Sequence, residues 1–272
     1  MDESPKLIVI GYTNIDINIT PSKKTVHPGG AAYFTACAAS LYLHPVGLVT
    51  RVGNDFDPTF LLSRVLQEGV HIISDKQTAK SIQTYHSEID LTQRDVVLEK
   101  GVAQDLCPED IPIRWLESAE YIHVGTMPPQ YQQIFIDFLR SKNIKACIST
   151  DTELSFLKNP ELKPGIIENL KKCDLVFVNR AEYDILKDEL KSVKKLVIKY
   201  DQDGAVYVED MRERGKVSTH HVDVLDATGA GDIFAGVFLA CRVLGKTIDE
   251  SLKEAAKTAT HSIEEEGIEH LF

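Results

Sequence analysis

Short apolar runs separated by helical segments are the feature of this sequence that most limits its fold. The runs are rich in β-branched residues and too short for helices, which predicts buried strands. The expected strands are residues 6–10, 47–51, 121–124, 146–150, 175–178 and 196–199. Between them, apolar residues recur with a helical period, as in residues 131–139, 233–241 and 248–259. Strands that alternate with helices need crossover connections, which favours a mainly parallel sheet covered by helices on both faces.

Two segments break this alternation. Residues 14–20 alternate polar and apolar side chains with period two, and residues 81–98 read as paired strands without a helix between them. They predict a small second sheet, which would either cover a cleft or form an edge or dimer surface. No repeat or Pro/Gly/Ser-rich linker divides the chain. Residues 1–272 are therefore predicted to form one domain, with lid segments near 12–20 and 80–100.

Composition and charge exclude several classes of protein. Of the 272 residues, 43% are hydrophobic and 26% are charged, as in ordinary globular domains. The formal net charge of −11 disfavours nucleic acid as a partner, although helix N-termini can still bind a phosphorylated ligand. Five cysteines without a close pair indicate reduced core residues. Because no signal peptide or membrane-spanning run is recognisable, we expect a cytoplasmic protein without a membrane partner.

The strongest local signal is the segment 226–232, Asp-Ala-Thr-Gly-Ala-Gly-Asp, which leads directly into the expected helix from residue 233. The small residues Gly229, Ala230 and Gly231 let a ligand approach the backbone, and the free amides of a first helical turn bind anions. Asp232 is placed to accept a proton from an alcohol. The alternative is a plain glycine turn with a carboxylate at a helix start. The spacing alone does not decide between them.

Other nucleotide-binding and hydrolase patterns are missing from the sequence. It contains no G-x-x-x-x-G-K-[ST] loop, and no G-x-G-x-x-G opens a helix, so the P-loop and Rossmann interpretations are weak. The absence of a G-x-S-x-G elbow removes the usual hydrolase interpretation.

Residues 226–236, D-A-T-G-A-G-D-I-F-A-G, resemble the C-terminal signature of the ribokinase-like, or PfkB, carbohydrate kinases, roughly D-T-x-G-A-G-D-x-F-x-G. Ala227 stands where the signature usually has Thr. The resemblance implies that Asp232 is the catalytic base for the acceptor hydroxyl. It also implies that Gly229, Ala230 and Gly231 form the anion hole for the γ-phosphoryl group.

A second resemblance lies at Pro28-Gly29-Gly30-Ala31-Ala32-Tyr33, which is similar to the family's N-terminal G-G motif beside the substrate. It implies that Gly29 and Gly30 contact the acceptor; alone, the pair would be read as a strand-to-helix turn. The commoner family form has Asn at position 31, and Ala31 removes that hydrogen bond. The form G-G-A-A-Y is closest to the branch that contains inositol and nucleoside kinases.

Residues 11–16 resemble the family's G-x-x-N-x-D element, in which the Asp binds substrate hydroxyls. The resemblance implies that Asn14 and Asp16 bind the acceptor, a role that suits a carboxylate because it can accept two hydroxyl hydrogen bonds. Without the other motifs, both would be read as solvent-facing residues of an alternating strand. Acceptor choice would then depend on lid side chains such as Tyr85 and Arg94.

Two further elements resemble the family's nucleotide and metal side. Asn179 and Glu182 match its N-x-x-E element, which implies a Mg²⁺ site held by Glu182 through water; a capping box is the alternative. Residues 199–205 resemble the (T/K)-x-G-x-x-G turn, which implies that Lys199 and Gly204 bind the nucleotide, although Asp201 replaces the first glycine.

Histidines give weaker signals. His261, with Ser262, falls near the family's adenine pocket, whereas His123 lies in an apolar strand and is predicted to be a core residue. His220 and His221 are adjacent, so on a strand they would face opposite ways and would not share a metal.

Taken together, the resemblance implies a three-layer α/β/α sandwich with a mainly parallel central sheet and a small β-sheet lid. We expect ATP-dependent phosphorylation of a hydroxyl on a small sugar, polyol or nucleoside. The implied cofactors are ATP and Mg²⁺, with a monovalent cation also allowed, and a homodimer through the lid is compatible with the pattern. The alternative is a ligand-binding or regulatory homologue with little turnover, favoured by Ala31 and Asp201 and disfavoured by the intact residues 229–232.

Overall fold

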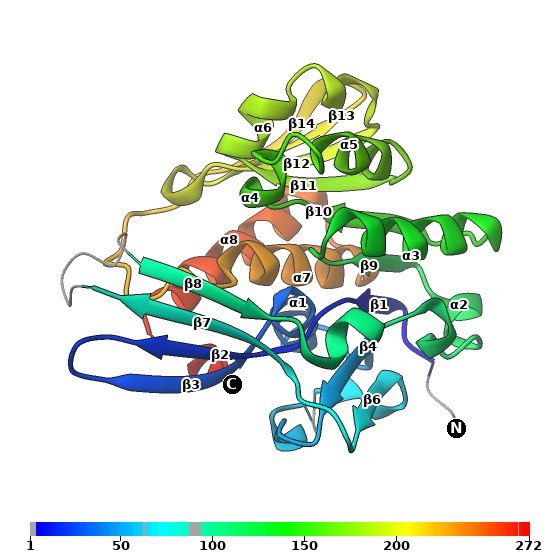
Figure 1. Cartoon of the computed structure of the whole chain (residues 1–272). Coiled ribbons are helices and arrows are strands. Elements are labelled where there is room, and N and C mark those ends of the chain that lie inside the picture. The colour runs from blue at the N-terminus through cyan, green and yellow to red at the C-terminus, as the bar shows by residue number, and fades with distance from the viewer. Residues whose placement is uncertain (1–3, 62–63, 87–93, 266) are drawn as a thin grey trace.

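A large, mainly parallel sheet runs through the centre of the molecule (Figure 1). The computed structural model describes residues 4–61, 64–86, 94–265 and 267–272, and within these ranges the sheet has ten strands. In spatial order they are β14 (Arg212–Val217), β13 (Ala205–Glu209), β12 (Lys195–Lys199), β11 (Leu175–Asn179), β10 (Cys147–Asp151), β9 (Tyr121–Val124), β1 (Leu7–Ile10), β4 (Val46–Gly53) and β5 (Val65–Leu66), with β6 (Val70–Ile73) also beside β4. Only the edge pairs β12–β13 and β13–β14 are antiparallel.

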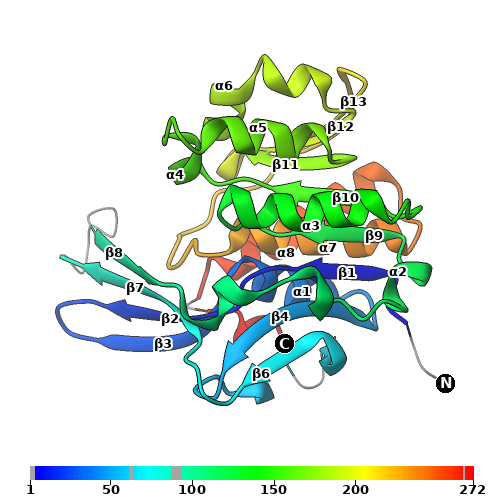
Figure 2. The same cartoon turned by 45° about the vertical axis from the view of Figure 1, so that its right-hand side comes forward.

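Helices cover both faces of this sheet, as Figure 2 shows. They are α1 (Ala31–Ser40), α2 (Trp115–Ser118), α3 (Pro129–Ser141), α4 (Leu154–Leu157), α5 (Lys163–Lys171), α6 (Arg180–Leu186), α7 (Ala230–Val243) and α8 (Ile248–Ser262). One core cluster joins α1, α7 and α8 to one face, and another joins α3, α5 and α6 to the other. In β1, Leu7 and Val9 belong to the first cluster and Ile8 and Ile10 to the second. Side chains that alternate between two dry faces explain the continuous apolar runs.

A second, four-stranded sheet projects from this body and forms the lid (Figure 1). Its order is β3 (Lys24–Gly29), β2 (Asn14–Ile19), β7 (Ala79–Tyr85) and β8 (Arg94–Glu99). Strand β2 pairs antiparallel with β3 and parallel with β7, and β7 pairs antiparallel with β8. The expected lid segments near 12–20 and 80–100 contain three of these strands, apart from residues 87–93, which lie outside the described ranges.

The three-layer α/β architecture predicted from the sequence is confirmed, and the six expected strands correspond to β1, β4, β9, β10, β11 and β12 within two residues at each end. Strands β3, β5, β6, β13 and β14 were not predicted. Strand β3 contains Pro28, which weakens a strand pattern but is tolerated here because β3 is an edge strand. The β13–β14 hairpin extends the far edge of the main sheet. Among the described residues, no helix is both long and apolar enough to cross a membrane.

Candidate active site

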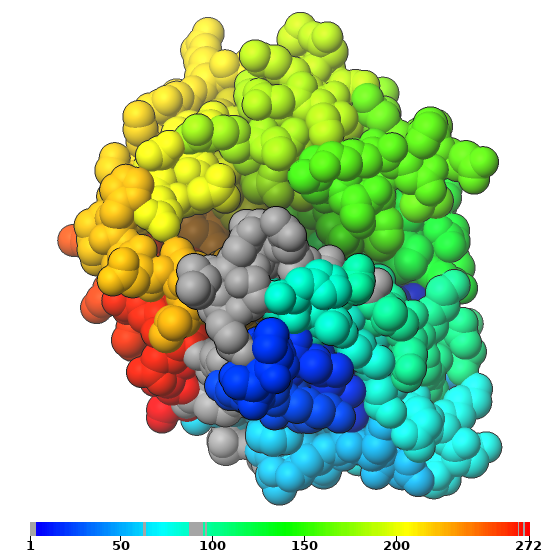
Figure 3. Space-filling view, turned by 60° about the vertical axis from the view of Figure 1, so that its left-hand side comes forward, coloured from blue at the N-terminus to red at the C-terminus, as the bar shows by residue number. Residues whose placement is uncertain are grey.

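A cavity of about 920 Å³ opens between the carboxyl ends of the parallel strands and the lid. Ligands of open α/β sheets bind at this end because loops from neighbouring strands meet there. In Figure 3 the opening lies on the face where the lid segments, in blue and cyan, stand opposite the yellow and orange segments that follow β12. Sequence-distant segments therefore contribute to one cavity.

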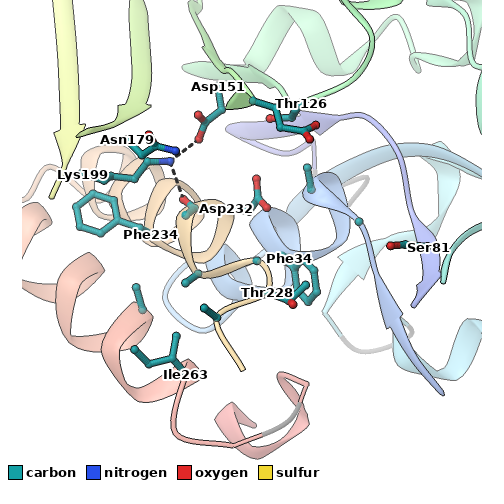
Figure 4. A pocket seen from close by; sticks show the side chains of 18 of the residues that line it. Phe34, Ser81, Thr126, Asp151, Asn179, Lys199, Thr228, Asp232, Phe234 and Ile263 are labelled. Atoms are coloured by element: carbon teal, nitrogen blue, oxygen red, sulfur yellow. Dashed lines mark hydrogen bonds and ion pairs between the residues drawn. The ribbon is translucent and has the colours of Figure 1, made fainter. Parts of the chain in front are cut away.

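Nearly all of the site residues expected from the sequence lie around this cavity. Those that line it are Asn14, Asp16, Gly30, Asn179, Glu182, Lys199, Gly204, Gly229, Ala230, Gly231 and Asp232. Gly29 is not among the lining residues but packs directly against Asp16. The lining also includes residues that sequence reasoning missed, among them Phe34, Asp151 and Ile263 (Figure 4).

The start of α7 has the geometry of an anion site. Gly229 precedes the helix with φ of 74°, a left-handed conformation that favours glycine. The amide of Ala230 donates a long 3.3 Å bond to the Ala227 carbonyl. Among the described residues, the amides of Gly229, Gly231 and Asp232 have no protein acceptor. Three N–H groups at a helix N-terminus are thus available to an anion in the cavity.

Phe34 explains why position 229 cannot carry a side chain. It projects from α1 and is 5% exposed, and a Cβ built on Gly229 would lie 2.4 Å from its ring. The ring therefore presses against the turn that precedes α7 (Figure 4). The contact between Phe34 and Gly229 therefore restrains the turn that carries the free amides.

The acceptor side of the cavity is formed by the hairpin of β2 and β3. Asp16 is 6% exposed, and a Cβ on Gly29 would lie 1.9 Å from its Oδ2 atom, so only glycine fits at position 29. The Oδ1 atoms of Asp16 and Asn14 are buried without a hydrogen-bond partner among the described residues. Gly30 has φ of 95° and starts α1. The two unpartnered oxygens are acceptors that a ligand with hydroxyl groups would satisfy.

Asn179 and Glu182 form a capping box at the start of α6. The Glu182 amide donates to Asn179 Oδ1 at 2.9 Å, and the Asn179 amide donates to Glu182 Oε2 at 2.8 Å. No hydrogen bond reaches Glu182 Oε1 from the rest of the described chain. The capping alternative is therefore correct for the backbone, and one carboxylate oxygen still lines the cavity.

This donor set fits Mg²⁺ held through water better than a metal held by the protein alone. In the parts of the chain that the structure describes, no three His, Cys, Asp or Glu side chains gather closely enough to ligate a metal. Mg²⁺ keeps several waters and is commonly bound by one or two carboxylates together with substrate phosphates. The free oxygen of Glu182 is suited to that indirect contact.

A buried ion pair between Asp151 and Lys199 lies beside the anion site (Figure 4). Asp151 ends β10 and Lys199 ends β12, and the Nζ to Oδ2 distance is 2.7 Å. The side chains are 4% and 13% exposed. Lys199 Nζ also lies 3.4 Å from the carbonyl oxygen of Gly231. Asp151 was not expected from the sequence, although a polar residue directly after a predicted strand of a parallel sheet is a usable signal.

The carboxylates around the cavity share a high proton affinity. Burial and, to a smaller extent, the negative charge of Asp151 raise the pKa of Asp232 to about 7, against the lowering effect of Lys199. Burial also raises the pKa of Asp16 to about 7, with a contribution from Asp226. The pKa of Glu182 rises to about 7 through burial and the negative charge of Asp151. Carboxyl groups tuned toward neutrality in a cavity are typical of proton-transfer sites.

The turn after β12 keeps glycine-like geometry despite its sequence departure. Asp201, which replaces a family glycine, has φ of 52°, so the backbone is left-handed at this position too. Gly204 has φ of 102°, and a Cβ there would lie 2.0 Å from the Val217 carbonyl oxygen. The turn is closed by the Tyr200 amide, which donates to the Gly204 carbonyl at 2.8 Å.

An apolar slot continues the cavity beyond the anion site. It is lined by Val222, Val224, Ala256, Ala259, Thr260 and Ile263. The residues expected here, His261 and Ser262, do not line it: His261 pairs with Glu264 at the surface, and Ser262 is buried against the Ala259 carbonyl. On helix α8 these two positions point away from the slot, whereas their neighbours face it.

His123 lies in the core, as expected, with its Nδ1 atom 3.1 Å from Ser149 Oγ. Its Nε2 atom has no partner among the described residues, so the histidine is only half satisfied. Burial lowers its pKa to about 3, which keeps the ring neutral.

Comparisons with known proteins identify the family of this chain. Residues 4–270 match the model of the pfkB family carbohydrate kinases. The chain is 30% identical to the cytidine kinase of Thermococcus kodakarensis, over 96% of this chain and 97% of that protein. It is 25% identical to the ribokinase of Bacillus subtilis, over 94% of this chain and 92% of that protein.

Solved structures share the fold at lower sequence identity. The nucleoside kinase of Methanocaldococcus jannaschii superposes with a TM-score of 0.77 at 20% identity, covering 97% of this chain and 93% of that chain. A protein from E. coli provisionally assigned as ribokinase II, in complex with ATP and Mg²⁺, gives a TM-score of 0.80 at 20% identity, with 97% and 94% covered. From the match along almost its whole length, this chain belongs to the pfkB family of carbohydrate kinases.

Proposed function

We propose that this protein transfers the γ-phosphoryl group of MgATP to a hydroxyl group of a nucleoside, sugar or polyol. The observation that carries the proposal is that one cavity holds both the Asp232 carboxylate with its three free amides and the unpartnered oxygens of Asn14 and Asp16. A base, an anion site and a hydroxyl-binding site are the parts that phosphoryl transfer to an alcohol needs. Kinases for nucleosides and sugars are among the relatives of this chain.

The lid hairpin would bind the acceptor. The buried Oδ1 atoms of Asn14 and Asp16 lack donors, and two neighbouring hydroxyl groups of a ribose or sugar would supply them. Gly29 leaves room for the Asp16 carboxyl group in this position. Holding the hydroxyl beside the phosphoryl group lowers the entropic part of the barrier.

Asp232 would accept the proton of the attacking hydroxyl. Its raised pKa of about 7 makes it a stronger base than an exposed aspartate while leaving it largely ionised at a mildly alkaline pH. The amides of Gly229, Gly231 and Asp232 would stabilise the charge on the equatorial oxygens of the phosphoryl group. Both roles depend on the start of α7.

The nucleotide would occupy the opposite side of the cavity. Gly204 and the turn around it face the cavity beside Lys199, and the apolar slot that ends at Ile263 suits a flat purine ring. Mg²⁺, when bound, neutralises phosphate charge, and Glu182 Oε1 would hold one of its water ligands. The ATP and Mg²⁺ in the E. coli structure support this choice of donor.

A coupled ATP-consumption assay tests the proposal. Wild-type protein is given MgATP and a panel that begins with cytidine and continues with other nucleosides, ribose, fructose and inositol, and products are identified by mass spectrometry. We expect acceptor-dependent ATP consumption that is lost in Asp232→Asn, with nucleotide affinity retained. Nucleotide and acceptor binding without any product would overturn the proposal in favour of the ligand-binding homologue.

We also propose that two copies pair through the outer face of the lid. On that face Val26, Ile17, Ile82 and Val97 form one row across all four strands. Val26 and Val97 are each 55% exposed. An apolar row on a sheet face that projects from the body is well placed to be covered by the same row of a second copy. Sedimentation analysis tests this pairing.

A further inference from the structure

Of the ion pair beside the anion site, Lys199 is expected to bind the nucleotide, whereas Asp151 has no role in the proposed phosphoryl transfer. We propose that Asp151 is a positioning residue for phosphoryl transfer: it holds the Lys199 ammonium against the Gly231 carbonyl, where this cation faces the transferred group. The inference deepens the proposed function and rests on it, since it assigns how that site handles phosphoryl charge.

Both oxygens of Asp151 are already occupied by protein donors. Oδ1 accepts from the amide of Thr152 at 2.8 Å, and Oδ2 accepts from Lys199 Nζ at 2.7 Å. The carboxylate, at 4% exposed, therefore has little capacity left to bind a metal or to accept a substrate proton. It contrasts with Glu182, whose second oxygen is open to the cavity. Asp151 is arranged to act on Lys199.

Lys199 retains one donor for a ligand. An ammonium group has three N–H donors, of which one meets Asp151 and another lies 3.4 Å from the Gly231 carbonyl oxygen. Besides a distant contact with the Phe177 ring, whose centroid lies 6.0 Å from Nζ, no third hydrogen-bond acceptor is present among the described residues, and the side chain lines the cavity. A Cβ built on Gly231 would lie 2.9 Å from Lys199 Nζ, so the ammonium group approaches the first turn of α7, and both residues line the cavity. In this proposal the third donor of Lys199 binds a phosphoryl oxygen held at that turn.

The strand end that carries Asp151 is itself held rigidly. Gln132, from α3, donates from Nε2 to Thr150 Oγ1 at 2.8 Å and to the Asp151 carbonyl at 3.2 Å. Asn169, from α5, donates to Gln132 Oε1 at 3.2 Å. Both amide side chains are buried, at 3% and 0% exposed. Asn169 Oδ1 has no partner among the described residues, but the other polar side-chain atoms of Gln132, Asn169 and Thr150 are paired. This buried network fixes the backbone, and with it the carboxylate that positions Lys199.

Because Asp151 neutralises the charge of Lys199, its removal should affect nucleotide affinity and kcat differently. A lysine without a counterion would attract phosphate more strongly but would no longer be fixed in place. Asp151→Asn should therefore leave nucleotide affinity unchanged or tighter while lowering kcat by about tenfold to 100-fold. Lys199→Met removes the donor and leaves a buried carboxylate facing the phosphates, so it should weaken nucleotide binding and lower kcat further. A residue with only a structural role would weaken binding and turnover together.

The test is a double-mutant cycle with two readouts. Affinity for the non-hydrolysable analogue AMP-PNP with Mg²⁺ is measured by calorimetry, and kcat and KM are measured with the best acceptor of the panel. If Asp151 acts through Lys199, adding Asp151→Asn to Lys199→Met should cause no further loss of kcat. It should also recover affinity, because it removes the unpaired carboxylate. Independent, additive losses would overturn the inference, as would an unchanged kcat in Asp151→Asn.

The ion pair of Arg51 and Asp110 supplies a matched control. It is somewhat less buried, with Asp110 7% and Arg51 23% exposed and an Nε to Oδ2 distance of 2.8 Å, and neither residue lines the cavity. Asp110→Asn should lower thermal stability without changing kcat or nucleotide affinity at 25 °C. Equal kinetic effects in Asp110→Asn and Asp151→Asn would show that loss of any buried pair disturbs the site, and would overturn the positioning role.

The two proposals fail in distinguishable ways. The calorimetric arm needs no acceptor, so wild-type protein that binds MgAMP-PNP but phosphorylates nothing would refute the proposed function alone. In that case the recovery of affinity in the double variant still decides whether Asp151 acts on Lys199. Wild-type protein with no affinity for MgAMP-PNP would overturn both.

Discussion

Replacing Asp232 by Asn should make this protein more stable while it abolishes its turnover. The substitution keeps the size and shape of the side chain but removes its charge. Burial and the charge of Asp151 raise the pKa of Asp232, so the ionised carboxylate lowers the free energy of unfolding. A site prepared for a proton transfer is then a source of instability in the free protein.

The magnitude follows from the two pKa values. The pKa of Asp232 is about 7 in the folded protein against a reference of 3.8, a difference of about 3 units. At about 1.4 kcal/mol per unit, the upper limit of the stabilisation is about 4 kcal/mol. For a chain of this size each kcal/mol shifts Tm by about 2–4 °C, so Asp232→Asn should unfold about 10 °C higher at pH 8.

The sign of the pH dependence gives the sharper test. A carboxyl group with a raised folded-state pKa contributes full stability below its unfolded pKa and loses that contribution as the pH rises through the folded value. Wild-type and variant should thus be equally stable below pH 3.8 and should diverge up to about pH 7, with the variant ahead. Thermal and urea unfolding of the nucleotide-free proteins across this range measures the difference.

The same variant is assayed for turnover with the best acceptor. Loss of a general base costs about 10²- to 10⁴-fold in kcat. A variant that is less stable than wild type at pH 8, or whose advantage does not grow with pH, would refute the placement of an ionised Asp232 in the cavity. A variant with full turnover would refute its role as the base.

Three further predictions concern the acceptor, the base and the lid. Gly29→Ala would place Cβ 1.9 Å from Asp16 Oδ2 and should lower kcat/KM for the acceptor by about 100-fold, whereas Gly165→Ala, whose nearest contact is 3.5 Å, should leave kinetics unchanged. The pH profile of kcat/KM should show an acid limb with an apparent pKa near 7, below which activity falls as Asp232 is protonated; a profile flat from pH 5 to pH 8 contradicts the assignment. Val26→Glu should give a monomer in sedimentation with its turnover retained, and an unchanged sedimentation coefficient would exclude the proposed pairing.

Pattern and motif together predicted the central architecture because local period reports burial directly. The apolar run of β1, for example, requires two buried faces. In β2 the alternation correctly predicts a strand, but the buried residue is the polar Asp16, which lines the cavity. Strand β3 was not predicted because its only aliphatic residue is Val26 and because it contains Pro28, which a sheet tolerates on an edge strand.

Site residues were predictable where a local backbone geometry demands particular residue types. The Gly229–Asp232 turn is such a case, since small residues and a helix start are visible in the sequence itself. Asp151 and Phe34 were missed because their roles arise from contacts with Lys199 and Gly229, which are distant along the chain. The sequence pointed to His261 and Ser262 for the apolar slot, but Ala259, Thr260 and Ile263 line it. Which face of α8 is turned toward the slot depends on tertiary packing, which the sequence alone does not give.

The hairpin of β2 and β3 belongs to the lid and also carries the acceptor-binding residues, which constrains how acceptor specificity can evolve. The chain leaves β1, forms this hairpin, and returns through Gly30 into α1, so the oxygens that await the acceptor are carried by the covering sheet itself. A movement of the lid sheet therefore also moves the bound acceptor. Mutations in this hairpin that shift acceptor preference should also change the rate at which ATP is hydrolysed by water. In this scaffold, new acceptor specificity would therefore arise together with a changed rate of ATP hydrolysis.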